Sequence, residues 1–237
     1  MTESRPATCI KVCCIASQEE AGIAIAAGAD ALGLVSHMPS GPGVIDEALI
    51  AHIARQVADT GQTQGRPIHT FLLTARQTAQ AIAEQHRRCQ TTHVQLVDDV
   101  PPNELQVLRQ LLPGVQLVQV IHVLNDASRV QALAVAPLVD MLLLDSGNPH
   151  LTVKELGGTG RVHNWAISAQ IVANSPVPVL LAGGLNPGNA ALAMATVRPY
   201  GLDICNGVRQ SRAEGGALDP GLLAAFITAA RAPGSPR

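Results

Sequence analysis

The chain has 237 residues, a formal net charge of −2 and 14 % charged residues, so it lacks the basic composition typical of nucleic-acid-binding proteins. Apolar residues make up 47 % and aromatic residues only 2 %, which predicts a core of Ala, Val, Leu and Ile. No apolar run approaches the ~20 residues of a membrane span, and we expect neither a span nor a signal peptide. The five cysteines are an odd number and three crowd at positions 9, 13 and 14, which favours reduced thiols in a cytoplasm.

Eight short apolar runs recur along the chain, separated by segments long enough for a crossover helix. Each run is continuous, as expected for strands that are buried on both faces of a parallel sheet. In chain order the predicted strands are Ile10–Cys14, Ala31–Val35, Ile68–Leu72, His93–Val97, Val115–Val120, Met141–Asp145, Val179–Ala182 and Leu202–Cys205.

Eight strand–helix pairs leave two architectures, a closed barrel or an open doubly wound sheet. The dinucleotide-binding pattern G-x-G-x-x-G is absent after the first strand, which favours the barrel. We therefore predict an α/β fold, a single (β/α)8 TIM barrel over residues 1–237, with loose termini at residues 1–8 and 233–237.

Helix-start signals follow several of these strands. Ser17 with Glu20 and Thr74 with Gln77 match the capping box, in which a hydroxyl and a carboxylate or amide satisfy two backbone N–H groups. Asn186-Pro187 and Asp219-Pro220 each place a capping side chain before a proline at the first helical position.

A thiol at the end of the first strand is a candidate catalytic group. Alternation points Cys9, Lys11 and Cys13 into the barrel and turns Cys14 toward the helices. Cys13 then lies at the C-terminal rim, where barrels of this kind keep their active sites, and nearby positive charge would make it a base. The alternative is a small buried apolar residue. A metal site built from these cysteines is disfavoured, because neighbouring strand residues point to opposite faces, and we expect no metal.

A carboxylate ends the sixth strand. Asp145 follows an apolar run, and burying a carboxylate there is costly unless it is used or paired. It is a candidate general acid. The alternative is an ion pair with Lys11, and more generally we expect Lys11 to find a buried partner in Asp145 or Asp203.

Glycine-bearing loops follow the seventh and eighth strands. In barrels these two loops commonly bind phosphate, because glycine lets backbone N–H groups approach the oxygens closely. The alternative is that these glycines only permit tight turns. The long segment Ser146–His163 carries a further glycine cluster and is typical of a functional loop, often a lid, while the alternative for the glycines is a flexible turn. The candidate binding residues are Gly183, Gly184, Asp203, Asn206, Gly207 and, in that cluster, Gly158.

Several motifs in order resemble the phosphoribosylanthranilate isomerase family of tryptophan biosynthesis over nearly the whole chain. Lys11-Val12-Cys13-Cys14-Ile15-Ala16 is similar to the family's Lys-[Ile/Val]-Cys-Gly-Ile-Thr. The further motifs are Gly28–Gly33, Val94–Leu96, the Leu-Leu-Asp that ends at Asp145, Gly157–Gly160 with Trp165, Ala182–Pro187, Val197–Pro199, and Asp203 with Gly207-Val208.

The resemblance implies a metal-free and cofactor-free Amadori rearrangement of N-(5-phosphoribosyl)anthranilate to an aminoketose phosphate. Carried over, Asp145 protonates the ring oxygen and Cys13 removes the C2′ proton. Phosphate would lie on backbone N–H groups near Gly184, Asn206 and Gly207, and Asp203 would face the substrate amine. The expected partner is a small phosphoribosyl molecule rather than a nucleic acid or membrane, and the chain is expected to be a cytoplasmic monomer or homodimer.

The sequence departs from the family at the end of the pocket that binds the aromatic acid. The family has an arginine that holds the anthranilate carboxylate, and that position falls near Pro42, which cannot make a bidentate contact. We hypothesise that His37 replaces the lost cation. The family glycine is Cys14, and Arg209 stands where the family favours glutamate.

Three interpretations follow from these motifs. The first is a working isomerase with an altered carboxylate contact. The second is a paralogous barrel isomerase for another phosphoribosyl amine or sugar phosphate, which the missing arginine favours. The third is a phosphosugar-binding barrel without catalysis, and the retained Cys13 and Asp145 count against it.

Overall fold

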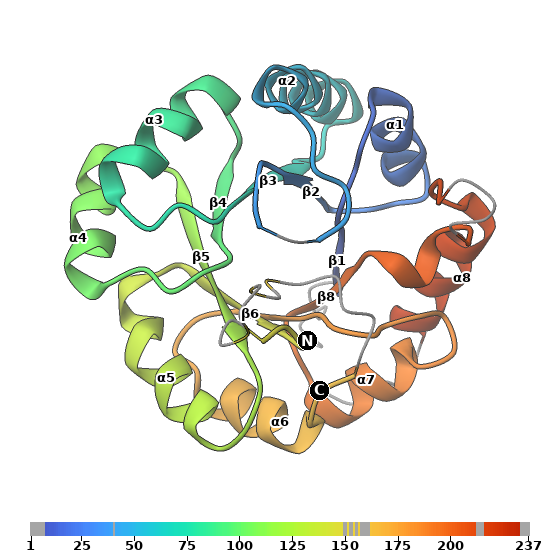
Figure 1. Ribbon diagram of the computed structural model, residues 1–237. Coiled ribbons are helices and arrows are strands. Elements are labelled where there is room, and N and C mark those ends of the chain that lie inside the picture. The colour runs from blue at the N-terminus through green and yellow to red at the C-terminus, as the bar shows by residue number, and fades with distance from the viewer. Residues whose placement is uncertain are drawn as a thin grey trace, which may run out of the picture.

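Eight parallel strands close into a barrel, and the crossover helices form a ring around it (Figure 1). The computed structural model describes residues 8–39, 41–148, 151, 154, 156, 162–211 and 216–232. Each strand pairs with its neighbour in chain order, and β1 closes the barrel against β8. The strands are β1 (Cys9–Val12), β2 (Ala31–Val35), β3 (His69–Thr74), β4 (His93–Leu96), β5 (Gln116–His122), β6 (Met141–Asp145), β7 (Val179–Leu181) and β8 (Gly201–Ile204).

All eight predicted strands are therefore confirmed, with ends that differ by two residues or fewer. The helices are α1 (Gln18–Ala26), α2 (Glu47–Gln64), α3 (Ala79–Cys89), α4 (Pro102–Leu111), α5 (Ala127–Val135), η1 (Ala136–Leu138), α6 (Trp165–Asn174), α7 (Ala190–Val197), η2 (Asn206–Val208) and α8 (Pro220–Ala230), where η marks a 3₁₀ turn. The barrel thus runs from Cys9 to Ala230.

Two of the four predicted helix starts are confirmed. Ser17 caps α1 by accepting from the N–H of Glu20 at 3.1 Å, and Asp219 caps α8 by accepting from the N–H of Leu222 at 2.9 Å. The other two are wrong. Thr74 lies inside β3 and donates to the Gln85 side chain at 2.6 Å, and the helix after β7 begins three residues beyond Pro187.

Alternation along the strands divides the core into two layers. Side chains such as Ile10 and Val12 pack outward against the helices, while Cys13, Phe71 and Leu143 pack inside the barrel. These small and branched side chains fill the interior, which is a packed core rather than a pore. Leu143 points into the barrel, and Asp145 does too, because alternate residues of a strand share a face.

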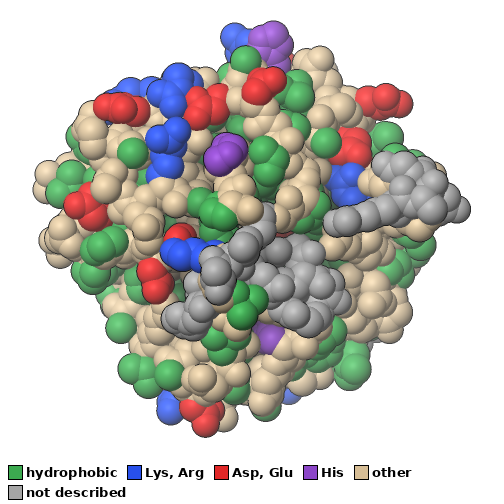
Figure 2. All heavy atoms as spheres, viewed as in Figure 1, with side chains coloured by type: hydrophobic (Ala, Val, Ile, Leu, Met, Phe, Trp, Pro, Cys, Tyr) green, Lys and Arg blue, Asp and Glu red, His purple; other side chains and the backbone are tan. Residues whose placement is uncertain are grey.

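The face at the barrel mouth carries acidic and basic side chains of both signs, interspersed rather than gathered into one patch over its described residues (Figure 2). Some of these groups pair with one another, as Arg88 does with Glu47. Within the described part of the chain, no helix is long and apolar enough to cross a membrane.

Candidate active site

A cavity of about 260 Å³ opens at the C-terminal end of the barrel. This is the end at which βα loops build the active sites of barrel enzymes. The cavity is lined by side chains and loops that follow most of the strands. The lining residues include Cys13, Cys14, Val35, Gly41, Pro42, Leu73, Gln95, Val120, Leu143, Asp145, Leu156, Gly183, Gly184, Asp203, Cys205, Asn206 and Gly207.

A buried ion pair joins β1 to β8 inside the barrel. Lys11 Nζ donates to Asp203 Oδ1 at 2.8 Å, and the side chains are 0 % and 7 % exposed. The two residues are paired in the register of β1 and β8. Burial lowers the pKa of Lys11, but the facing Asp203 carboxylate outweighs it and the net pKa is raised, so Lys11 carries its charge. Of the two predicted partners for Lys11, the structure selects Asp203.

Cys13 lies directly above this pair and is held in an unusual thiol environment. A hydrogen bond from the Cys14 side chain lowers the pKa of Cys13, burial opposes that shift, and the Lys11 ammonium lowers the pKa further. Cys14 keeps its proton, because its hydrogen bond to Cys13, followed by its contact with the Cys205 thiol and by burial, raises its pKa. Cys13 therefore has the electrostatic support that a thiolate base needs.

Gly33 of β2 makes the room for this arrangement. A Cβ atom at Gly33 would lie 2.7 Å from Cys13 Sγ and 3.1 Å from Lys11 Nζ. Real Cβ contacts are essentially never as short as the one to Cys13 Sγ, so any side chain at this position would displace the thiol and crowd the ammonium. A glycine inside a strand often marks such a close approach.

Asp145 lines the same cavity from the far side, separated from β1 around the barrel by β7 and β8. It is 7 % exposed. No described residue forms a hydrogen bond or ion pair with its carboxylate, and its backbone oxygen accepts from Val123 N–H at 2.9 Å. The predicted alternative, an ion pair between Asp145 and Lys11, is wrong, because Lys11 is paired with Asp203.

The glycine-bearing loops after β7 and β8 lie against one another at Gly207. A Cβ atom there would come within 2.0 Å of Leu185 O, so the two backbones approach more closely than any side chain allows. Gly183 and Gly184 have φ of +83° and +64°, a left-handed conformation that favours glycine. Among the described residues, none accepts a hydrogen bond from the backbone N–H of Gly184 or Gly207.

Arg209 ties the loop after β8 to the loop after β1. Its guanidinium donates to both carboxylate oxygens of Glu20, at 2.7 and 2.9 Å, and also to the carbonyl oxygen of Cys14. Burial raises the pKa of Glu20, but the hydrogen bonds from Arg209 and from Ala16 N–H outweigh it and lower the pKa overall. The basic residue at a position where the resembled family favours glutamate thus fixes the backbone beside Cys13.

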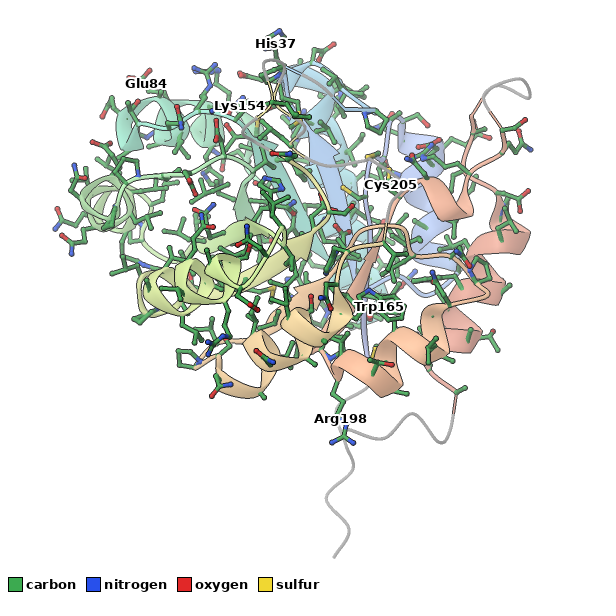
Figure 3. All side chains as sticks on the ribbon, turned by 60° about the horizontal axis from the view of Figure 1, so that its bottom comes forward. His37, Glu84, Lys154, Trp165, Arg198 and Cys205 are labelled. Atoms are coloured by element: carbon green, nitrogen blue, oxygen red, sulfur yellow. The ribbon has the colours of Figure 1, made fainter. Side chains whose placement is uncertain are left out.

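The structure does not bring every predicted site residue into the cavity. His37 is exposed, is absent from the cavity lining and points outward at the edge of the molecule, whereas Cys205 lies at the barrel mouth (Figure 3). Gly158 lies outside the described residues, as does most of the segment predicted to be a functional loop. Pro42 does line the cavity, and no Lys, Arg or His is among the described lining residues.

Two residues of the cavity were missed by the sequence analysis. Cys14 was expected to face the helices, but β1 ends at Val12 and Cys14 takes φ +62°, which turns it into the cavity. Alternation cannot find such a residue, since it holds only within a strand. Gln95 of β4 is 3 % exposed and its Oε1 has no partner among the described residues. A glutamine inside an apolar strand was its only signal.

Comparison with known proteins places the whole barrel in one group. Residues 10–229 match the family model described as N-(5'phosphoribosyl)anthranilate (PRA) isomerase. The N-(5'-phosphoribosyl)anthranilate isomerase of Haloferax volcanii is 33 % identical over 225 residues, 94 % of this chain and 93 % of the relative. That of Methanocella arvoryzae is 30 % identical over 207 residues, 86 % and 91 % of the two chains.

A solved structure of a phosphoribosyl anthranilate isomerase, in complex with reduced 1-(o-carboxyphenylamino)-1-deoxyribulose 5-phosphate, matches the fold. It superposes with a TM-score of 0.73, is 22 % identical, and covers 94 % of this chain and 98 % of its own. At that identity the match shows that the two chains share the barrel fold.

Proposed function

This chain belongs to the N-(5'-phosphoribosyl)anthranilate isomerase family, and we propose that Cys13 and Asp145 are the general base and general acid of its reaction. The enzyme is an isomerase of tryptophan biosynthesis. It converts N-(5-phosphoribosyl)anthranilate, an aminoaldose phosphate, into the corresponding aminoketose phosphate. The observation that carries the assignment of roles is one cavity lined by a buried thiol and, from a separate strand, a buried carboxylate.

The reaction needs two proton transfers at different parts of the ribose. Asp145 donates a proton to the furanose ring oxygen, which breaks the C1′–O bond while the nitrogen lone pair forms a protonated imine between C1′ and the anthranilate nitrogen. Cys13 then removes the proton from C2′, the electrons of the C2′–H bond form the C1′–C2′ double bond of the enol, and the electrons of the C=N bond return to nitrogen. Tautomerisation of the enol gives the ketone. A thiolate and a carboxylic acid supply both steps, so the proposal requires no metal or cofactor.

The surroundings of Cys13 support its role as the base. Cys14 donates a hydrogen bond to it, and the Lys11 ammonium lies on the same barrel face two residues earlier, so a negative charge on the thiol is stabilised from two directions. The position of Asp145 supports its role as the acid, because its buried side chain lines the cavity beside Leu143 and Val120 and no described residue binds its carboxyl group.

We place the substrate phosphate against the adjoining loops after β7 and β8. The two glycine N–H groups without a described acceptor, at Gly184 and Gly207, provide donors at the edge of the cavity. Backbone donors and a helical turn are the groups that usually hold phosphate at this end of a barrel. Asn206 and Asp203 lie beside them on the cavity wall and are proposed to contact the ribose and the amine.

The part of the cavity expected to bind the anthranilate carboxylate has no arginine among its described lining residues. Gly41 and Pro42 line the cavity where the family pattern places an arginine. Since His37 points away from the cavity, we do not assign it to the carboxylate. We propose that the phosphate and ribose supply most of the binding energy, and that the anthranilate carboxylate is bound more weakly than a guanidinium would bind it.

The test is turnover of freshly prepared phosphoribosylanthranilate, followed by the loss of anthranilate fluorescence. Cys13→Ala and Asp145→Asn should each reduce kcat by about 10²–10⁴-fold, the usual contribution of a general acid or base. The matched control is Cys9→Ala, which removes a thiol from the same face of β1 below the cavity. Burial, followed by the charge of Asp30, raises the pKa of Cys9 to about 12, so that thiol stays protonated.

A kcat within tenfold of wild type in Cys13→Ala would show that another group removes the C2′ proton. Complementation of a strain that lacks the isomerase tests the activity itself, separately from the residue roles. The oligomeric state, monomer or homodimer, and the cytoplasmic location remain predictions.

A further inference from the structure

Two thiols of the cavity transfer no proton to or from the substrate in the proposed mechanism, and they lie close together. Cys205 Sγ is 2.7 Å from Cys14 Sγ, although the residues are 191 positions apart in the sequence. Both residues line the cavity, and both are free cysteines. A disulfide has an S–S bond of about 2.05 Å, so the sulfur atoms need move together by less than 1 Å.

The backbone on both sides is arranged for such a bond. Val12 pairs with Ile204 in the register of β1 and β8. Cys205 directly follows Ile204 and Cys14 comes two residues after Val12, so both cysteines lie just beyond the paired ends of neighbouring strands. Adjacent strands lie about 4.8 Å apart, close to the Cα separation of roughly 4.4–6.8 Å that disulfides adopt. The left-handed φ of +62° at Cys14 turns its side chain away from the helices and toward Cys205.

The surroundings also favour reaction with an oxidant. Cys205 is partly exposed to the open cavity, through which a molecule as small as a hydroperoxide can enter. The Arg209 guanidinium contacts the Cys14 carbonyl oxygen, and its charge interacts with both thiols. The thiolate is the form of a cysteine that attacks a peroxide.

We propose that Cys14 and Cys205 are a redox modification site, at which a hydroperoxide converts the two thiols into a reversible disulfide across the mouth of the barrel. The Cys205 thiolate attacks one peroxide oxygen and breaks the O–O bond, which gives a sulfenic acid and, with hydrogen peroxide, one water. Cys14 sulfur attacks the sulfenic sulfur, its proton leaves with the hydroxyl group as a second water, and the S–S bond forms. Two thiols are oxidised and one peroxide is reduced.

A disulfide between Cys14 and Cys205 would change the hydrogen bonding of the neighbouring base, Cys13. Cys14 can no longer donate a hydrogen bond once its sulfur is in a disulfide, and this hydrogen bond is the largest influence that lowers the Cys13 pKa. In the oxidised enzyme a smaller fraction of Cys13 is therefore in the thiolate form. Dithiothreitol reverses the change by exchanging with the disulfide.

The test exposes the purified full chain to low concentrations of hydrogen peroxide and maps disulfides in a tryptic digest made without reductant. The expected product links the fragments 12–55 and 162–209, and the titratable thiols of the denatured chain fall from five to three. Fragment 12–55 contains both Cys13 and Cys14. Cys13→Ala should still give the linked fragments, which would show that Cys14 is the cysteine that reacts. Cys14→Ser and Cys205→Ser should not give it.

The same samples give a second readout. We expect kcat of the linked enzyme to fall at least tenfold and to recover fully with dithiothreitol. Absence of the linked fragments, or their persistence in Cys14→Ser, would overturn the disulfide. A mapped disulfide with unchanged kcat would overturn its effect on Cys13. The mapping does not depend on isomerase activity, so its result stands apart from the proposed catalytic roles.

Discussion

The buried pair of Lys11 and Asp203 allows a prediction with a magnitude. Lys11→Met removes the ammonium but keeps an apolar stem of similar length, and it leaves the Asp203 carboxylate, 7 % exposed, without its 2.8 Å partner. Breaking a buried ion pair from one side costs about 3–5 kcal/mol, since the remaining charge is uncompensated. For a chain of this size each kcal/mol corresponds to roughly 2–4 °C in Tm, so we expect a decrease of roughly 6–20 °C.

The assay is equilibrium urea unfolding followed by circular dichroism, together with thermal melts. The double variant Lys11→Met/Asp203→Asn removes both charges and should recover most of the loss, because a neutral amide tolerates the apolar interior better than a lone carboxylate. Arg109→Met is the matched control, since Arg109 and Asp140 form a pair that is 39 % and 28 % exposed. That substitution should cost at most about 1 kcal/mol. A cost below about 1 kcal/mol for Lys11→Met, or a double variant as unstable as the single one, would refute the reasoning.

Three further predictions concern the cavity and its support. Gly33→Ala places a Cβ 2.7 Å from Cys13 Sγ and should lower kcat at least tenfold, whereas Gly22→Ala, with no atom within 4 Å of its new Cβ, should leave kcat unchanged in the same fluorescence assay. Pro42→Arg restores a guanidinium at the cavity wall and should lower KM at least tenfold with kcat nearly constant; an unchanged KM would place the carboxylate elsewhere. Burial is the main cause that lowers the pKa of His93 to about 3, so the folded chain keeps it neutral while the unfolded chain protonates it near 6.5. Its contribution to stability is therefore present above pH 6.5 and lost as pH falls toward 3, and His93→Gln should remove about 2 kcal/mol of the loss measured between pH 7.5 and pH 5, as unfolding curves at both pH values will show.

The barrel and the inward positions of Lys11 and Asp145 are visible in the amino-acid sequence alone. Strands buried on both faces are continuous apolar runs, so their number and order are visible without a structure. Strict alternation within a strand then places Lys11 and Asp145 inside the barrel, and the parallel order of the strands brings their C-terminal ends to one rim. These are local rules of chain geometry, which hold whatever the rest of the chain does.

Capping signals were less reliable, because a capping side chain can bind a distant partner instead of the backbone next to it. Ser17 was read correctly because its partner Glu20 lies one turn away. Thr74 carries the same pattern, but its hydroxyl donates to Gln85 within the packed core. A side chain that has both a local and a distant partner cannot be assigned from spacing, because the choice depends on what the fold packs against it.

The surroundings of the thiols, by contrast, depend on contacts between residues that are far apart in the sequence. Nothing near Cys14 in the sequence indicates a left-handed φ or a contact with Cys205, because both follow from the closure of β1 against β8 and from the Arg209 clamp. The same holds for His37, which was expected in the cavity near the arginine position but is exposed and points outward, although Gly41 and Pro42 of the same loop line the cavity. Alternation sets the face of a residue inside a strand, but beyond the strand end the backbone follows long-range hydrogen bonds, which a single sequence does not display.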